Sequence, residues 1–233
     1  EGWQERPAMM QGRSGLVVGV LGVHLIAAGG RGPGGVLREA EICDLRDSSA
    51  GFQAMPSLQE PREYASSAVV DSEFWVMGGG ETGATNSVEI WNAALGLWRT
   101  GTDMREKRYG GSAVWHDGRI WVVGGSRHFR GKQLTTLEVL DPREGYWTCH
   151  NLSAPEGPGY SSSLWGSGVV AHGSSVWICG GAYRESEESL STVYRLDLRT
   201  LQLETLSQAL GDALAPSEGR LEVARWCGAA CIV

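Results

Sequence analysis

The chain has 233 residues, and its 27 acidic and 20 basic side chains give a formal net charge of −7. This balance argues against a nucleic-acid backbone as the main partner, because proteins that bind phosphates cluster positive charge. Membrane insertion is not expected either, since the longest apolar stretch, residues 15–28, is too short and is interrupted by glycine. The 34 glycines, ten tryptophans and 42% apolar residues instead fit many short strands in one all-β body.

The first residues carry part of a pattern that returns later in the chain. The sequence starts without a methionine and without a signal-peptide pattern. Trp3 precedes Met9 by six residues, as Trp98 precedes Met104. We therefore interpret Trp3 as the outer strand of a repeated unit whose earlier strands are absent.

A register of arginine, glycine pair, acidic residue and aromatic residue then repeats along the chain. Arg13, Arg62 and Arg108 each lie 16 residues before a glycine pair, and Leu164 holds this position in the fourth copy. The pairs begin at 29, 78, 124 and 180, and such periods of 49, 46 and 56 residues indicate a repeat architecture. The other repeated positions are Glu41, Glu89, Glu138 and Tyr194, then Asp44, Asn92, Asp141 and Asp197, and finally Phe52, Trp98, Trp147 and Leu203.

Each copy predicts four short strands and no helix. In the clearest copy, small residues and valine at 110–114 predict a first strand, and Asp117-Gly118 predicts a hairpin turn. The apolar run 120–123 predicts a second strand and 136–140 a third, and Trp147 marks a fourth. We expect one domain over residues 1–233, because such repeats pack as one unit. The expected blades span 10–54, 59–100, 105–149 and 161–206, with a partial blade at 220–233.

The repeated register resembles the kelch repeat, a β-propeller blade motif with a double glycine and spaced aromatic residues. The resemblance covers residues 3–233, and the fourth copy departs from it by lacking the arginine and by carrying Leu203 in place of a tryptophan. It implies an all-β kelch-type β-propeller with four complete four-stranded blades and orphan strands at both ends. Closing a ring of five would leave the partial blade without its apolar second strand. We therefore expect an open arc of a propeller with more blades, six being the expected number.

The cysteines and histidines show no spacing that would predict a metal site or a catalytic site. The five cysteines are Cys43, Cys149, Cys179, Cys227 and Cys231, and none forms a CxxC pair. We expect them to be reduced and the protein to be cytoplasmic, although a disulfide between distant blades stays open. His116 and His172 fall near hairpin turns, where a surface histidine is expected rather than a ligand. No catalytic residue, metal or cofactor is expected.

The resemblance implies a non-enzymatic protein-interaction module, because kelch proteins mostly bind other proteins. The substrate-recognition part of a ubiquitin-ligase adaptor and a cytoskeletal scaffold are the two roles considered within this class. A few relatives are enzymes, so a propeller enzyme of the sugar isomerase or oxidase type is the alternative. A bound metal or several polar side chains converging at the central channel would favour the enzyme.

Antiparallel strand order places the start of each first strand and the loop after each glycine pair on one face. The resemblance to kelch proteins implies that this face binds a protein or peptide with acidic segments, and bidentate pairing of guanidinium groups with carboxylates would explain the preference. The candidate residues are Arg13, Arg62, Arg108 and Arg225 at the strand starts, and Arg31, Ser126, Arg127, Tyr183 and Arg184 in the loops. The alternative is that these arginines pair with carboxylates or carbonyl groups of the blades and never meet a ligand.

Overall fold

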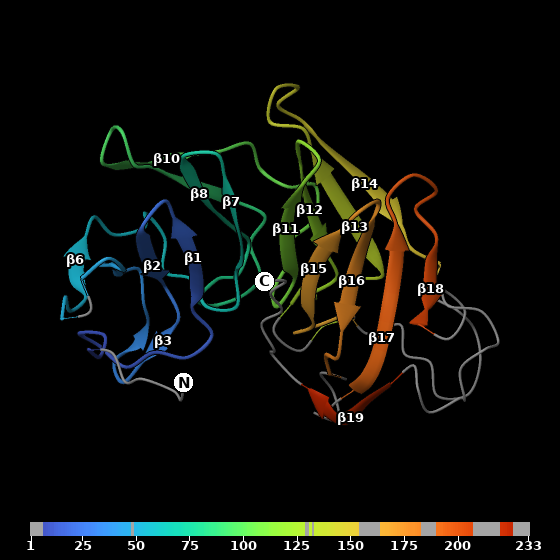
Figure 1. The fold of residues 1–233 in the computed structure, drawn as a ribbon, viewed down its shortest axis with the longest axis horizontal. Coiled ribbons are helices and arrows are strands. Elements are labelled where there is room, and N and C mark those ends of the chain that lie inside the picture. Colours follow the sequence, from blue (N-terminus) through green and yellow to red (C-terminus); the bar gives the residue numbers. More distant parts are fainter. Residues whose placement is uncertain are drawn as a thin grey trace.

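The computed structural model describes residues 7–47, 49–128, 131, 133–153, 164–182 and 190–206, and the backbone of 220–225. In these residues four antiparallel sheets follow one another and form the blades of a propeller (Figure 1). The predicted all-β fold with four complete four-stranded blades is confirmed. No described segment forms a helix that could span a membrane.

The strands of each blade pair in chain order from the inner strand to the outer one. Blade 1 contains β1 (Val17–Leu21), β2 (His24–Ala28), β5 (Ala40–Asp44) and β6 (Gln53–Met55), with a small hairpin of β3 (Arg31–Gly32) and β4 (Gly35–Val36). Blade 2 contains β7 (Ser66–Val70), β8 (Glu73–Met77), β9 (Val88–Asn92) and β10 (Leu97–Thr100). Blade 3 contains β11 (Ser112–His116), β12 (Arg119–Val123), β13 (Thr136–Leu140) and β14 (Trp147–Asn151). Blade 4 contains β15 (Gly168–His172), β16 (Ser175–Cys179), β17 (Leu190–Asp197) and β18 (Leu203–Thr205).

The two ends of the chain are only partly described. A further strand, β19 (Arg220–Arg225), pairs with the start of β17. The orphan strands expected at Trp3 and after Arg225 lie outside the described residues. The inner strands contact one another in the order β1, β7, β11, β15, and among the described residues β1 and β15 share no contact of that extent. The described blades therefore form an arc rather than a closed ring (Figure 1).

The second strands of blades 2 and 3 are buried on both faces because each lies between two neighbouring blades. In β8, Phe74 and Val76 pack against blade 1, whereas Trp75 and Met77 pack against blade 3. All four side chains are at most 5% exposed. This two-sided burial explains why the strand reads as a continuous apolar run rather than an alternating one.

The outer-strand tryptophans fill the widening space between blades. Trp98 packs into the core between blades 1 and 2, and Trp147 packs into the core between blades 2 and 3. Their indole N–H groups donate to the carbonyl groups of Pro56, at 2.7 Å, and Thr102, at 2.9 Å, in the preceding connections. Burying such a ring removes about 150–250 Å² from water, worth roughly 4–6 kcal/mol before entropic costs.

The repeated Asp or Asn position organises the turn between the third and fourth strands. The Asp141 carboxylate accepts the backbone N–H of Arg143 at 3.0 Å, and Asp44 accepts that of Arg46 at 2.9 Å. Asp197 likewise accepts the backbone N–H of Arg199 at 2.9 Å, whereas Asn92 accepts that of Leu95, three residues on, at 3.0 Å. These side chains supply the hydrogen bonds that a tight turn otherwise leaves to water. We call the face that carries these turns the hairpin face.

The predicted first strand of blade 3 begins two residues too early. β11 starts at Ser112, not at Gly110, because Gly110 adopts a left-handed backbone with φ of 71°. A Cβ atom at Gly110 would lie 2.0 Å from the indole nitrogen of Trp165 in the next blade. Trp165 therefore approaches the backbone at Gly110 too closely for any side chain to fit there. Glycine also adopts this left-handed conformation without strain.

Candidate functional site

The repeat-position arginines lie inside their own blades. The Arg62 side chain is 1% exposed, and its Nε donates to Glu89 at 3.0 Å. Its Nη1 donates to the backbone carbonyl groups of Gly78, at 2.8 Å, and Ser87, at 3.1 Å. Its Nη2 donates to the Ser87 hydroxyl at 2.7 Å. All three guanidinium nitrogens thus bind groups of blade 2.

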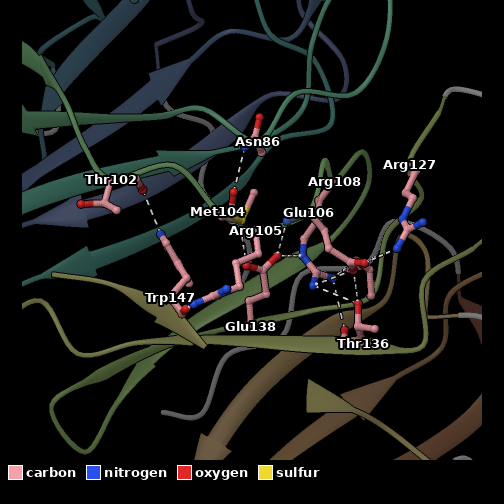
Figure 2. A network of polar contacts seen from close by, with 11 residues as sticks. Asn86, Thr102, Met104, Arg105, Glu106, Arg108, Arg127, Thr136, Glu138 and Trp147 are labelled. Atoms are coloured by element: carbon pink, nitrogen blue, oxygen red, sulfur yellow. Dashed lines mark hydrogen bonds and ion pairs between the residues drawn. The ribbon is translucent and has the colours of Figure 1, made fainter. Parts of the chain in front are cut away.

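Arg108 repeats this arrangement in blade 3, as Figure 2 shows. Its Nε donates to Glu138 at 2.9 Å, and both side chains of this ion pair are completely buried. Its Nη1 donates to the carbonyl groups of Gly124, at 2.8 Å, and Thr136, at 3.2 Å, and its Nη2 to the Thr136 hydroxyl at 3.0 Å. Glu138 also accepts the backbone N–H of Arg105 at 2.6 Å. The pair therefore connects the third strand, the glycine pair and the segment that enters the blade.

The backbone at the same position joins each blade to the one before it. The Arg108 carbonyl accepts the N–H of Gly79 at 2.7 Å, and the Leu164 carbonyl accepts that of Gly125 at 3.4 Å. The first glycine of each pair makes room for this contact. A Cβ atom on Gly78 would lie 2.5 Å from the Arg108 carbonyl oxygen. The glycine pair is therefore the place where the backbone that enters the next blade packs against this blade.

The fourth blade replaces the arginine–glutamate pair by an apolar pair. Leu164 and Tyr194 stand where the other blades carry arginine and glutamate, and they are 2% and 1% exposed. Both belong to the apolar core between blades 3 and 4. Because the charged partners disappear together, no buried charge is left alone. The joint loss is visible in the sequence and could have shown that the two positions are partners.

These contacts correct the expectation for the arginines at the strand starts. Arg13 binds the carbonyl groups of Gly29, at 2.9 Å, and Glu39, at 2.8 Å, and also forms an ion pair with Glu41, with none of its side chain exposed. Arg13, Arg62 and Arg108 therefore take the structural role that the sequence left open. We remove all three from the residues that could contact a partner.

The starts of the inner strands and the loops after the glycine pairs do share one face, as expected. Three isolated antiparallel bridges join them, Ser14 with Arg31, Glu63 with Gly80, and Tyr109 with Ser126. We call this side of the molecule the glycine-loop face. Ser14 of the first bridge also lines a cavity between the four inner strands.

Arg31 is an exposed arginine of the glycine-loop face, and it forms an ion pair with the buried carboxylate of Glu63. Its Nε and Nη2 bind the two oxygens of Glu63 at 2.7 and 2.8 Å, across the seam between blades 1 and 2. The Arg31 side chain is 49% exposed, whereas that of Glu63 is 3% exposed. Tyr109 of blade 3 donates its hydroxyl to Glu63 at 2.7 Å. The hydrogen bond and the charge of Glu63 raise the pKa of Arg31.

Arg127 holds a similar position above blade 3. Its side chain is 60% exposed and forms an ion pair with Glu106, which is 13% exposed (Figure 2). Burial acts to raise the pKa of Glu106, but the hydrogen bond from Thr136 and the pairing with Arg127 outweigh it, so the pKa lies below its usual range. Glu106 thus stays ionised and fixes the guanidinium of Arg127 at the surface.

Ser126 does not belong to the accessible surface. It is completely buried, and its hydroxyl donates to the backbone carbonyl of His128 at 2.8 Å. We therefore assign Ser126 a role in shaping its loop rather than in contacting a partner. Tyr183 and Arg184 lie outside the described residues, as does the side chain of Arg225.

Sequence reasoning missed an aromatic cluster at the mouth of the channel. Tyr64 lies with its ring centroid 5.0 Å from that of Tyr109 and 5.7 Å from that of Trp165. Tyr64 has a left-handed backbone with φ of 51° at the position where the other blades carry glycine. Its ring covers Gly15 of blade 1, so one side chain contacts three other blades. The signal in the sequence was that Tyr64 stands two residues after the arginine position, where the other three repeats carry Gly15, Gly110 and Gly166.

A cavity of about 210 Å³ lies between blades 3 and 4 on the hairpin face, and a larger one of about 590 Å³ lies on the channel axis. The axial cavity is lined by glycine, serine, alanine and valine residues in or just before the four inner strands, together with Leu16 and Tyr64. Of the described residues in its wall, Tyr64 alone is titratable. No group of three or more metal-ligating side chains occurs among the described residues. The polar convergence that would favour an enzyme is thus not seen in the described lining.

Comparisons with known proteins point to one family. The Kelch motif family model matches residues 107–149. Beta-scruin of Limulus polyphemus is 28% identical over 151 residues, which is 62% of this chain and 16% of the scruin. Human Kelch-like protein 25 is 29% identical over 90 residues, 39% of this chain and 15% of that protein. An F-box/kelch-repeat protein of Arabidopsis thaliana is 30% identical over 107 residues, 44% of this chain and 28% of that protein.

A solved structure supports the fold. YjhT superposes with a TM-score of 0.69 over 85% of this chain and 66% of that chain, at 20% sequence identity. The chain spans about one sixth of the length of the scruins that it matches. The chain thus carries a Kelch motif at residues 107–149 within a four-bladed propeller fold, and it is similar to kelch-repeat proteins.

Proposed function

We propose that this propeller is a protein-interaction module that binds its partner on the glycine-loop face. The observation that carries the proposal is the outward, anchored position of Arg31 and Arg127, with side chains 49% and 60% exposed. Anchoring by Glu63 and Glu106 reduces the side-chain freedom that binding would otherwise remove. The similarity to kelch-like and F-box/kelch-repeat proteins supports the same class of function.

The partner that we propose is a protein segment with carboxylate or hydroxyl groups. Arg31 uses Nε and Nη2 for Glu63, and Arg127 uses Nη2 for Glu106, so each guanidinium keeps N–H donors that no described residue occupies. Such donors suit acceptors of a partner, and charge-assisted bonds are the stronger kind. The loop after the third glycine pair adds Arg130 and Lys132, whose placement lies outside the described residues.

Within this class we propose substrate recognition in a ubiquitin-ligase adaptor first and a cytoskeletal scaffold second. Both assignments come from the family resemblance rather than from a feature of this chain. The proposed enzymatic alternative gains no support from the described wall of the axial cavity, where serine hydroxyl groups and Tyr64 are the polar side chains.

The test selects peptides from a random library on the purified chain and measures the affinity of the selected peptides by calorimetry. We expect enrichment of Asp, Glu, Ser and Thr. The double variant Arg31→Glu/Arg127→Glu should bind these peptides at least about tenfold more weakly, a change of about 1.4 kcal/mol.

The matched control is Arg46→Glu/Arg143→Glu, which reverses two exposed arginines on the hairpin face. Its affinity should equal that of the unmodified chain. Equal losses in both double variants, or no loss in either, would count against the glycine-loop face as the binding site.

A further inference from the structure

The cavity of about 210 Å³ on the hairpin face lies between blades 3 and 4, whose strands are all described. Trp121, Val139 and Thr148 form its floor, because they lie in register across the second, third and fourth strands of blade 3. Leu198 and Leu201 in a turn of blade 4 form the opposite wall. The interior of the cavity is therefore largely apolar.

The corresponding space between blades 2 and 3 is filled by two large side chains. Arg99 lies over the ring of Trp75, with 5.9 Å between its guanidinium carbon and the ring centroid. The same guanidinium forms an ion pair with Glu73 at 2.9 Å. Trp147 of blade 3 packs into the core between these two blades. The second-strand tryptophan of blade 2 is thus covered on its outer side.

Both filling side chains are replaced by smaller ones between blades 3 and 4. In the repeat, Thr148 stands at the position of Arg99, and Leu203 stands at that of Trp147. Arg119 stands at the position of Glu73, eleven residues after the repeat arginine. The floor of the cavity therefore lacks the cover that it has in blade 2. An arginine lies at the position where blade 2 carries the carboxylate.

The two carboxylates in the cavity lining already have partners. Asp141 accepts three hydrogen bonds from Arg143, at 2.8 to 3.0 Å. Glu144 is hydrogen-bonded with Tyr146, and this contact raises the pKa of the tyrosine hydroxyl. These two acidic groups are therefore poorly placed to hold a cation from solution.

The two arginines in the lining, Arg119 and Arg199, are exposed. Their guanidinium groups form no hydrogen bond or ion pair with any residue in the described part of the chain. Arg119 acts on Asp141 only through its charge, which helps to lower the pKa of that carboxyl. Two free guanidinium groups beside an apolar floor match a ligand that has a carboxylate and an apolar body.

We propose that this cavity binds a small organic carboxylate, with the apolar body against Trp121 and the carboxylate bound by Arg119 and Arg199. The volume of about 210 Å³ suits a group the size of one aromatic side chain, since pockets for drug-sized ligands measure roughly 300–1,000 Å³. A protein partner would need a much wider contact surface than this cavity offers. The site lies on the hairpin face, so it is independent of the partner proposed for the glycine-loop face.

The test titrates 3-phenylpropanoate into the purified chain and follows the backbone N–H signals by NMR. The signals of Leu198, Arg199 and Leu201 should shift and reach saturation. The uncharged 3-phenylpropanamide has nearly the same shape and should bind at least about tenfold more weakly, the effect of one charge-assisted hydrogen bond. The cation 3-phenylpropylamine should not bind. Equal affinities for the three compounds would overturn the proposal, because they would show that the site does not select a carboxylate.

Two variants test the residues that form the site. Arg119→Gln removes one charge at an exposed position and should weaken binding of 3-phenylpropanoate at least about tenfold. The double variant Arg119→Glu/Thr148→Arg recreates the ion pair of Glu73 and Arg99 and covers Trp121 with a guanidinium. It should no longer bind, while far-UV circular dichroism shows that the strands are retained. Undiminished binding in either variant would overturn the proposal.

Controls separate this cavity from a general attraction of anions to arginine. Arg46→Gln removes an arginine of the hairpin face whose side chain is 68% exposed, and it should bind like the unmodified chain. Arg31→Glu/Arg127→Glu should also bind normally, so a failure of the glycine-loop face as a partner site leaves this result unchanged. The proposal is wrong if binding does not saturate, if Arg46→Gln loses as much affinity as Arg119→Gln, or if the cavity binds acidic peptides but no small carboxylate.

Discussion

At the residue scale, the buried pair of Arg108 and Glu138 stabilises the blade only while both members are present. Two charges removed from water cost several kcal/mol each, and their attraction and hydrogen bonds offset that cost. Neither side chain has access to solvent, so neither can regain hydration if the other is lost. The fourth blade shows the other stable solution, with Leu164 and Tyr194 at the same two positions.

We predict that Arg108→Leu lowers the free energy of unfolding by about 3–5 kcal/mol, because it leaves the Glu138 carboxylate buried without a counter-charge. Adding Glu138→Tyr should recover most of that loss by recreating the pair of blade 4. Urea denaturation of the two variants measures both effects. As a control, Arg143→Ala breaks an ion pair whose arginine side chain is 81% exposed and should cost less than about 1 kcal/mol. A double variant less stable than Arg108→Leu alone would contradict this reading.

A second prediction concerns the turn carboxylate Asp141. The side-chain and backbone hydrogen bonds from Arg143 lower the pKa of Asp141 from 3.8 to about 2. Since the pKa is lower in the folded protein, the pair stabilises the fold above pH 4 and loses this effect as the pH falls towards 2. In Arg143→Ala the backbone N–H remains, so the pKa should return part of the way to 3.8. Carboxyl titration by NMR measures both values, and an unchanged pKa in the variant would refute the assignment.

At the element scale, the sequence predicted the strands well because their signals are local. The predicted third strand, 136–140, matches β13 (Thr136–Leu140), and the apolar run at 120–123 falls within β12 (Arg119–Val123). The role of Arg108 could not be predicted in the same way. Its partner Glu138 lies 30 residues away, and only the folded blade decides whether that carboxylate or a ligand reaches the guanidinium.

The glycine pairs give a further prediction at this scale. Gly124→Ala should lower stability by about 2–5 kcal/mol, because its φ is 65° and the added Cβ would lie 2.4 Å from the Leu164 carbonyl oxygen. Gly118→Ala is the matched control, with φ of 71° and no backbone atom within contact distance, and should cost about 1–2 kcal/mol. Thermal unfolding compares the two. Equal costs would show that conformation alone, and not the crossing of the next blade, requires the glycine.

At the scale of the whole molecule, the number of blades and the way in which the ring closes could not be predicted from the repeats alone. The register shows that the two faces of a blade differ, but the same register fits any blade number. Val18 and Val20 are ordinary strand residues in the sequence, and only the folded arc shows that they are each 51% exposed. The expectation of a six-bladed propeller therefore stays a prediction.

The carbonyl contact at the glycine pair has a consequence for how such chains can change length. The backbone N–H groups of Gly30, Gly79 and Gly125 donate to the carbonyl groups of Arg62, Arg108 and Leu164. The hydrogen bond thus forms whether the accepting residue is arginine or leucine. Deleting residues 62–107 would bring Arg108 to Gly30 with the same bond available. Blades can thus be lost or duplicated by recombination in whole steps, with each new junction already able to form.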